Sequence, residues 1–322
     1  MESADYSREG FMDGTSIAWP EKTRELHSHH FDSTIWNDLV FRDDDIVIAT
    51  YAKSGTTWTQ QIVGQLLFGG APDVPVAQLS PWLDLRVPPK AVKLPVVEAQ
   101  THRRFLKTHL PVEALRFSPK VKYLYIGRDG RDVIWSMYNH HANANDAWYA
   151  ALNDTPGRVG PPIGRPPESI RQYFLEWLER DGYPFWSFWD NIRSWWAIRS
   201  LPNVMLLHFA ELKADLPAAI RRIAGFLDIA IDERQWPAIL EHCGFAWMKA
   251  HAAGCAPLGG ALWEGGASTF IHKGTNGRWR DVLTQEELER YAKRVAEVMP
   301  PEAAAWMERG KAALPPQLLR SK

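Results

Sequence analysis

Cysteine is scarce in this 322-residue sequence, which contains only Cys243 and Cys255 and no CxxC pair. A disulfide framework and a cysteine zinc site are therefore excluded, and a reducing compartment is favoured. A histidine-based metal site is not indicated either, because His140 and His141 lack a carboxylate or cysteine partner at ligand spacing. We expect no metal.

Long apolar runs and an excess of one charge are missing as well. No uncharged apolar run reaches the roughly 18 residues that a membrane span needs, and residues 1–22 carry charges where a signal peptide has its apolar core. The net charge of -1 provides no basic field for binding nucleic acid or a membrane surface. We expect a cytoplasmic protein with neither of these partners, forming one domain over 1–322 with a partly flexible leader at 1–30.

Short, strongly apolar runs are what the sequence does contain. Four of them, apolar on both faces as buried parallel strands require, lie at 45–51, 104–109, 120–126 and 203–209. Helical patterns lie between and after them at 57–68, 132–141, 170–177, 186–198 and 217–227. This alternation predicts an α/β fold with a central parallel β-sheet flanked by helices.

Proline and glycine concentrate in three segments, 69–97, 153–167 and 251–276. We interpret these as long loops of the kind that shape a binding site. Thr284 and Glu287 have the spacing of a capping box, which predicts a final helix packed on the body. Of the 16 tryptophans, we assign three at helical spacing to the core: Trp189, Trp195 and Trp196.

The sharpest motif is Lys-Ser-Gly-Thr-Thr-Trp at 53–58, between the first predicted strand and the first predicted helix. A strand, a glycine turn and a helix start aim backbone N–H groups at one spot, where a phosphate fits. Thr56 and Thr57 add hydroxyl donors, and Lys53 adds a full charge. The motif is not a Walker A loop, because its lysine precedes the glycine, so it indicates chemistry other than ordinary magnesium-nucleotide chemistry.

Two more predicted strands end in residues suited to the same crevice. Arg128 follows the run 120–126, and His109 closes the run 104–109. Ligands in open parallel sheets lie outside the carboxyl ends of the strands, so both residues are expected beside the first loop. His109 is a candidate general base because its ordinary pKa lies near 6.5, although a hydrogen-bonded structural histidine is the alternative.

Other polar residues have equally plain structural alternatives. Arg131 suits either an anion site or a surface ion pair with Asp129 or Asp132. The segment 271–280 suits either a loop folding over a phosphate or a solvated basic turn. Five further histidines are interpreted as leader or helix-capping residues: His27, His29, His30, His140 and His141.

Together, the motifs at 53–58, 107–111, 127–136 and 272–284 resemble the cytosolic sulfotransferase family, in a bacterial-type member, over most of the chain. The resemblance implies a P-loop-like three-layer architecture. It also implies a PAPS-dependent enzyme, which transfers the sulfuryl group of 3′-phosphoadenosine 5′-phosphosulfate (PAPS) to a hydroxyl or amine. The product 3′,5′-bisphosphoadenosine (PAP) leaves by in-line displacement, and no metal is required.

The same resemblance implies residue roles. His109 is the general base, Lys107 supports it, and Lys53 contacts the leaving phosphate. The residues implied for the donor site are Lys53, Ser54, Gly55, Thr56, Thr57, Trp58, Arg128, Ser136, Phe209, Cys243, Phe245, His272, Lys273 and Gly274. The chain departs from the family pattern at five positions, which bear on donor affinity: Phe209, Cys243, His272, Arg278 and Leu283.

The resemblance also implies an acceptor pocket with aromatic walls, suited to a small hydrophobic or aromatic acceptor. The candidate walls, for each of which ordinary packing is the alternative, are Phe11, Trp82, Trp148, Tyr149, Trp247 and Trp263. A dimerisation motif is only partly matched by Arg280, Thr284 and Glu289, which leaves both a monomer and a homodimer open.

Two other function classes stay open at the level of sequence. A P-loop phosphotransferase or nucleotide kinase would need the glycine-lysine loop that is missing here. A non-catalytic nucleotide-binding protein fits the departures from the family pattern. However, it has no need of Lys53, Lys107 and His109 beside a phosphate.

Overall fold

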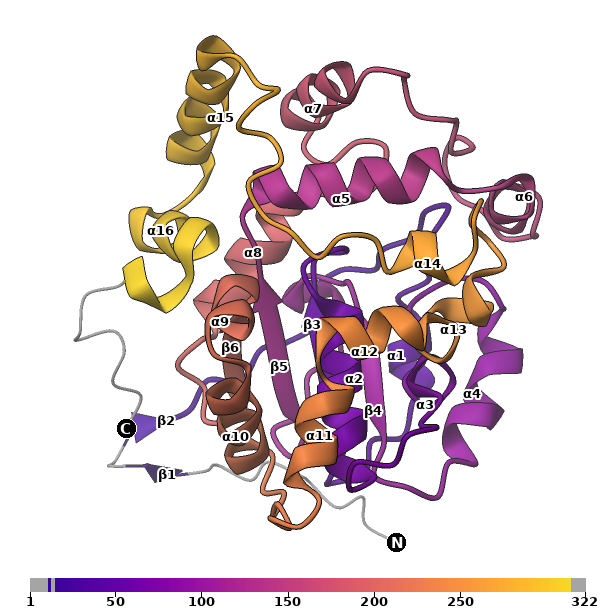
Figure 1. Ribbon diagram of the computed structural model, residues 1–322, viewed down its shortest axis with the longest axis vertical. Helices are drawn as coiled ribbons and strands as arrows, with labels where there is room; N and C mark the ends of the chain where they lie inside the picture. The colour runs from indigo at the N-terminus through magenta and orange to yellow at the C-terminus, as the bar shows by residue number, and fades with distance from the viewer. Residues whose placement is uncertain (1–10, 13–14, 314–322) are drawn as a thin grey trace, which may run out of the picture.

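Four parallel strands form the centre of the computed structural model, which describes residues 11–12 and 15–313 (Figure 1). The strands are β3 (Ile46–Thr50), β4 (Phe105–Thr108), β5 (Lys122–Gly127) and β6 (Val204–His208). Their order in the sheet is β4-β3-β5-β6, and each neighbouring pair is parallel. The four strands predicted from the sequence, and the α/β fold class, are therefore confirmed.

Both faces of the sheet are buried. Along β5, Tyr123 and Tyr125 pack into one apolar cluster, and Leu124 and Ile126 pack into another on the opposite face. Strands covered on both faces have no polar side to alternate with, which explains the continuous apolar runs in the sequence. The three tryptophans assigned to the core lie in the first cluster and are at most 5% exposed: Trp189, Trp195 and Trp196.

Helices supply the outer layers on the two faces. The first cluster receives side chains from α1 (Ile35–Asp38), α4 (Lys90–Glu98), α5 (Gly130–Ala142), α7 (Ile170–Glu179), α8 (Phe188–Ala197), α15 (Gln285–Val298) and α16 (Pro301–Arg309). The second receives them from α2 (Thr56–Leu67), α9 (Phe209–Ala214), α10 (Leu216–Phe226) and α11 (Trp236–His242). The result is the three-layer architecture that the resemblance implied.

The capping box that begins the final predicted helix is present. The Thr284 hydroxyl accepts from the backbone N–H of Glu287, and the Glu287 carboxylate accepts from the backbone N–H of Thr284. Both otherwise orphaned donors at the start of α15 are satisfied in this way.

The interpretation of 69–97 as one long loop is wrong. This segment contains α3 (Val76–Leu79) and all but the last residue of α4, which carries Pro95 inside it. Tertiary contacts override the proline: the Lys93 ammonium donates to the carbonyl oxygens of Trp82, Leu83 and Leu85 and so fixes α4 against the chain before it.

The other two loop predictions have different outcomes. Residues 154–169 form no helix or strand after α6 (Asp146–Asn153), as expected. The segment 251–276 is broken into single turns, namely α13 (Ala252–Cys255), η2 (Pro257–Gly260) and α14 (Ala267–Phe270), and it follows α12 (Phe245–Ala250).

Smaller elements complete the chain: β1 (Phe11–Met12), β2 (Thr15–Ser16), η1 (Val112–Ala114) and η3 (Gly310–Ala313). The side chain of Phe11, a predicted acceptor wall, lies outside the described residues. Over 11–12 and 15–313, no helix has the length and apolar character needed to cross a membrane.

Candidate active site

A cavity of about 350 Å³ lies at the carboxyl edge of the sheet. The segments that follow the four strands each contribute to its wall, through Lys53 after β3, His109 after β4, Arg128 after β5 and Phe209 after β6. The structure thus brings into one cavity the strand ends that were predicted to share a crevice.

The turn between β3 and α2 forms one end of this cavity. Gly55 caps α2 with a φ of 116°, and a Cβ at this position would lie 3.0 Å from Cδ2 of Phe209. Lys53 also has a positive φ, 67°, a conformation that is strained for a side chain with a Cβ and is often found at functional sites. Gly55, Thr56 and Thr57 line the cavity at the start of α2, so helix N–H groups without a partner inside the helix lie where an anion can reach them.

The imidazole of His109 is connected to this turn through Thr50. Its Nδ1 lies 2.8 Å from the backbone oxygen of Thr50, and because a carbonyl oxygen only accepts, Nδ1 carries the proton. The Thr50 hydroxyl lies 3.0 Å from the same Nδ1 and 2.7 Å from the hydroxyl of Thr56. Burial, together with the positive charges of Lys107 and Lys53, holds the pKa of His109 well below its ordinary value. The ring is therefore neutral near pH 7, with its lone pair on Nε2.

Three cavity-lining cations surround this imidazole and the turn. Burial lowers the pKa of Lys53 to about 7, with further lowering by Lys107 and Arg128. Burial likewise lowers the pKa of Lys107 to about 8 and that of Arg128 to about 10. An anion bound among them would reverse these shifts, because a nearby negative charge favours the protonated form.

Arg128 fixes the loop after α14 against the β3–α2 turn. Its guanidinium donates to the backbone oxygens of Lys53 and Thr275 and to Oδ1 of Asn276. It also lies 4.2 Å from the centre of the Phe209 ring. Arg128 is only 6% exposed. These contacts therefore hold its guanidinium in one orientation in the cavity wall.

Arg131, for which an ion pair was the alternative, does form one. It lies 2.7 Å from Asp129 and 3.6 Å from Glu308, and its guanidinium stacks 4.2 Å from the Trp279 ring. Arg131 is not among the described residues that line the cavity.

The opposite end of the cavity is an aromatic enclosure. The Trp82 ring meets the His109 imidazole edge-on at 4.6 Å, and the Trp186 ring lies parallel to it at 5.7 Å. Phe270 lies below the Lys53 ammonium, 4.5 Å from ring centre to Nζ. Asp84 orders this wall, since it accepts from Nε1 of Trp82 and from the backbone N–H of His109.

Most predicted site residues line this cavity: Lys53, Gly55, Thr56, Thr57, Trp58, Trp82, Lys107, His109, Arg128, Ser136, Phe209, Phe245, Trp263, His272, Lys273 and Gly274. Among the described side chains, five predicted ones do not: Ser54, Trp148, Tyr149, Cys243 and Trp247.

Each of these five has a different local role. Trp148 is buried in a small cluster with Trp263, and the Tyr149 hydroxyl donates to the backbone oxygen of His141. The Trp247 ring lies against two imidazoles away from the cavity. Cys243 acts through its backbone, whose oxygen accepts from Nε1 of Trp58 at 2.8 Å, and Ser54 is only 2% exposed, in the turn.

Several cavity residues were missed or discounted in the sequence. The main ones are His30, Trp135, His140, Phe185, Trp186, Met248, Phe270 and Arg278. Four of them lie far from any motif, so no local signal could have identified them: His30, Phe185, Trp186 and Met248. Trp135 and Arg278 lie inside the motifs 127–136 and 272–284, and His140 follows the first of these motifs on the same helix, α5.

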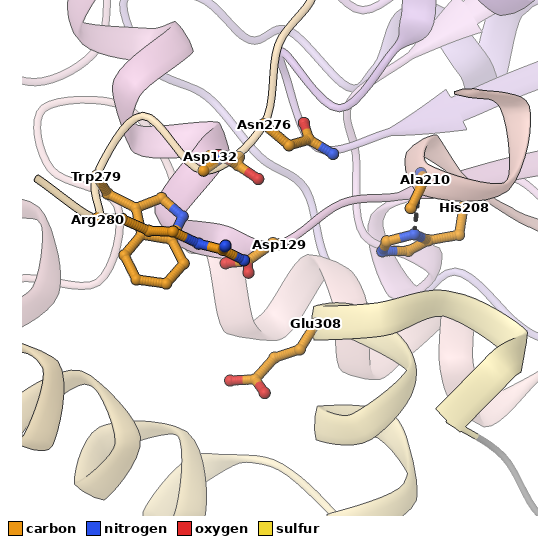
Figure 2. A pocket seen from close by; sticks show the side chains of 9 residues that line it. Asp129, Asp132, His208, Ala210, Asn276, Trp279, Arg280 and Glu308 are labelled. Carbon is orange, nitrogen blue, oxygen red and sulfur yellow. Dashed lines mark hydrogen bonds between the residues drawn. The ribbon is translucent and has the colours of Figure 1, made fainter. Parts of the chain in front are cut away.

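A second, smaller hollow of about 280 Å³ lies on the far side of Asp132 (Figure 2). Figure 2 shows the carboxylates of Asp129, Asp132 and Glu308 around it, with Trp279 and Arg280 at one side. Burial raises the pKa of Asp132 and of Glu308. A wall rich in carboxylates disfavours phosphate, so the larger cavity is the candidate active site.

The fold and the larger cavity define a class: a three-layer α/β protein with a phosphate-type loop and a neutral imidazole at one sheet edge, the arrangement of a group-transfer enzyme that uses a phosphorylated donor. In the described ranges, no group of three or more histidine, cysteine or acidic residues is arranged to hold a metal ion.

Comparisons with known proteins specify this class. A family model described as "Sulfotransferase domain" matches residues 43–301. The chain is 32% identical over 308 residues to a glycolipid sulfotransferase of Mycobacterium tuberculosis, covering 88% of this chain and 94% of that protein. It is 30% identical over 274 residues to human sulfotransferase 2B1, covering 83% and 69% of the two chains. The chain belongs to the sulfotransferase family.

Solved structures agree with this assignment. Retinol dehydratase in complex with androsterone and inactive cofactor PAP is similar with a TM-score of 0.63 and 25% identity, over 83% of this chain and 84% of that one. Mouse sulfotransferase SULT7A1 complexed with PAP shares the fold, with a TM-score of 0.64 and 21% identity, over 84% and 89% of the two chains.

Proposed function

We propose that this protein transfers the sulfuryl group of PAPS to a hydroxyl, or an amine, of a small hydrophobic or aromatic acceptor. The observation that carries the proposal is the connection through Thr50, which places the hydroxyl of Thr56 and the imidazole of His109 on either side of one threonine. One cavity thereby holds a phosphate-type loop and a neutral base next to each other.

The donor suits the charges of this cavity. Lys53, Lys107 and Arg128 are drawn together with their pKa values lowered, which favours an anionic ligand. Arg128 and Ser136 are assigned to the 3′-phosphate, with Lys273 and the backbone of Gly274 on the loop after α14. Trp58, Phe209 and Phe245 form an aromatic site for the adenine. When bound, PAPS supplies the activated sulfuryl group.

The chain's own residues perform the rest of the reaction. Nε2 of His109 accepts the proton of the acceptor hydroxyl, because Nδ1 is occupied by its hydrogen bond to Thr50. Lys53 and the N–H groups of the turn stabilise the negative charge that grows on the leaving phosphate. Lys107, whose ammonium lies 4.8 Å from the centre of the Trp82 ring, adds positive charge beside the base.

The acceptor contacts the aromatic enclosure. Trp82, Trp186, Trp263 and Phe270 present flat apolar surfaces, which favour a phenol or another hydrophobic alcohol. The name of one relative contains a glycolipid, and a solved neighbour is in complex with androsterone; both molecules combine a hydroxyl with a large apolar body.

The test is transfer of a labelled sulfuryl group from PAPS to 2-naphthol in the presence of a metal chelator. We expect formation of the naphthyl sulfate and of PAP in equal amounts. PAP binding without product would favour the non-catalytic alternative. Phosphorylation of an acceptor by ATP that stops with the chelator would favour the kinase alternative, and either result would overturn the proposal.

A further inference from the structure

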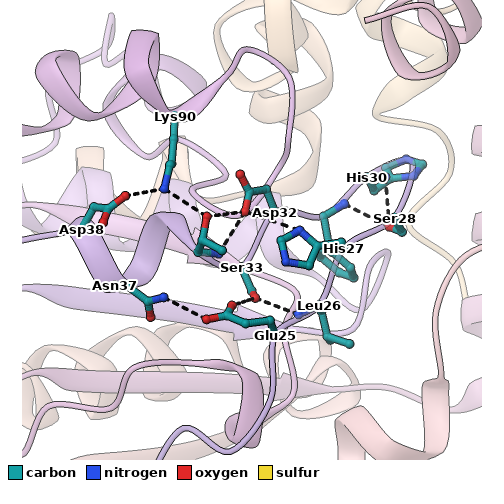
Figure 3. A network of polar contacts seen from close by, with 12 residues as sticks. Glu25, Leu26, His27, Ser28, His30, Asp32, Ser33, Asn37, Asp38 and Lys90 are labelled. Carbon is teal, nitrogen blue, oxygen red and sulfur yellow. Dashed lines mark hydrogen bonds and ion pairs between the residues drawn. The ribbon is translucent and has the colours of Figure 1, made fainter. Parts of the chain in front are cut away.

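Two neighbouring histidines before α1 lie outside every motif of the sequence. One of them nevertheless lines the acceptor end of the cavity, which is the aromatic enclosure proposed to contact the sulfuryl acceptor. His29 is 8% exposed and His30 is 3% exposed, and His30 belongs to the cavity wall. Their segment is fixed in place: the backbone N–H of His30 donates to the Ser28 hydroxyl, and the backbone oxygen of His30 accepts from Arg86 (Figure 3). His30 is therefore a fixed part of the site.

The contacts of the two rings determine where their protons lie. Nε2 of His29 is 2.9 Å from the backbone oxygen of Pro184 and must donate to it, because a carbonyl oxygen only accepts. Burial and the nearby charge of Arg86 lower the pKa of His29, which keeps its ring neutral with a lone pair on Nδ1. Nδ1 of His30 lies 2.5 Å from Nδ1 of His29, so Nδ1 of His30 is the donor in this hydrogen bond.

Because the proton of the His30 ring lies on Nδ1, Nε2 of His30 carries a lone pair and can only accept a hydrogen bond. Burial, and the neighbouring histidines, hold the pKa of His30 well below its ordinary value, so the ring stays neutral. Within the described residues, no group donates to this nitrogen. An acceptor atom that is fixed, neutral and unpaired beside a cavity favours a ligand that donates to it.

The position of His30 shows which part of a ligand it would contact. Its ring lies 5.9 Å from Trp82 and 5.7 Å from Trp186, the same two indoles that flank His109. Phe185 lies 5.4 Å away on a third side. The imidazoles of His30 and His109 therefore lie against the same two indoles, and the Nε2 atom of each carries a lone pair, of which the reaction needs only that of His109.

We propose that Nε2 of His30 accepts a hydrogen bond from a second hydroxyl of the acceptor, so that this enzyme prefers acceptors with two hydroxyl groups on one apolar body. This inference rests on the proposed function, in which His109 takes the proton of the first hydroxyl. A monohydroxy acceptor would leave the His30 nitrogen buried and unpaired, and sites built to pair a polar group discriminate against ligands that lack it.

The experiment is calorimetric titration of the full chain, with and without PAP, using 2-naphthol and the isomeric dihydroxynaphthalenes. These probes share one ring system and differ in the second hydroxyl. We expect at least one isomer to bind about 10-fold more tightly than 2-naphthol, the size of one neutral hydrogen bond in a buried site. Equal affinity of all probes for the wild-type protein would overturn the proposal.

Three variants separate recognition from general damage. His30→Phe keeps a flat ring but removes the nitrogen, and should reduce the preference for the tightest-binding dihydroxy isomer over 2-naphthol to less than about 3-fold. His30→Gln offers an amide oxygen and should restore part of the preference. The control His27→Phe changes the half-exposed histidine of the same segment and should keep the wild-type preference.

A preference that survives His30→Phe would contradict the proposal, and so would an equal loss of affinity for all probes. The readout is independent of turnover. A protein that discriminates these probes through His30 but transfers no sulfuryl group would contradict the proposed function alone.

Discussion

The two ends of the cavity are built in different ways. The donor end combines segments that follow strand ends, namely the turn 53–57 and the start of α2, with the loop 273–275 after α14. The acceptor end comes from side chains of segments far apart in the sequence, such as His30, Trp82 and Trp186. The donor end is therefore constrained by the fold itself, whereas the acceptor end can change with single side chains.

The largest effect is expected where the two ends meet, at His109. His109→Ala removes the proton acceptor, so kcat should fall by about 10²- to 10⁴-fold, the usual contribution of a general base. PAP affinity should change by less than about 3-fold, because the imidazole contacts the donor end only through Thr50. Steady-state kinetics and calorimetry measure the two quantities, and a variant that keeps its kcat would refute the assignment of the base.

The next largest effect concerns the donor end alone. Arg128→Met removes a charged donor, and PAP affinity should fall by about 10- to 100-fold, the range for hydrogen bonds to a charged group. Arg131→Met is the matched control from the same motif, since Arg131 is paired with Asp129 outside the cavity, and it should bind PAP like the wild-type protein. Calorimetry that finds the two variants equally weakened would contradict the separation of their roles.

The pH dependence of PAP binding tests the same end without a mutation. Lys53 and Lys107 have pKa values of about 7 and about 8 in the empty site, and a bound anion raises both. Binding therefore takes up protons, and affinity should decrease as the pH rises from 7 to 9, by about 10-fold if Lys107 dominates and by about 50-fold if Lys53 dominates. Proton uptake is measured by titration in buffers of different ionisation enthalpy, and an affinity that increases with pH would contradict the assignment.

The smallest effect is expected at the acceptor end, from two tryptophans that sequence alone could not distinguish. Trp263 lines the cavity and Trp247 does not. Trp263→Leu should raise the KM for 2-naphthol by about 3- to 10-fold through lost aromatic contact, while Trp247→Leu should leave it within about 2-fold. The reverse order of the two KM values would show that the acceptor binds elsewhere.

The different construction of the two cavity ends also explains which parts of the molecule could be predicted from the sequence. The strands and the donor turn have local signatures, because a buried strand needs an apolar run and a left-handed turn needs Gly55. His30 has no such signature, since its burial depends on contacts with Arg86 and with aromatic rings distant in the chain. The helix α4 was missed for a related reason: Pro95 argues against a helix locally, while the contacts of Lys93 that support it are tertiary.

The most direct measurement is a calorimetric titration of the wild-type protein with PAP, 5′-AMP and ADP in a metal chelator, and with ATP and magnesium in parallel. We expect PAP to bind at least about 10-fold more tightly than 5′-AMP and ADP without metal, because we propose that Arg128 contacts the 3′-phosphate, which the other two nucleotides lack. Equal binding of PAP and 5′-AMP, or preferential binding of magnesium ATP, would contradict the assignment of the strand-edge cavity as the donor site.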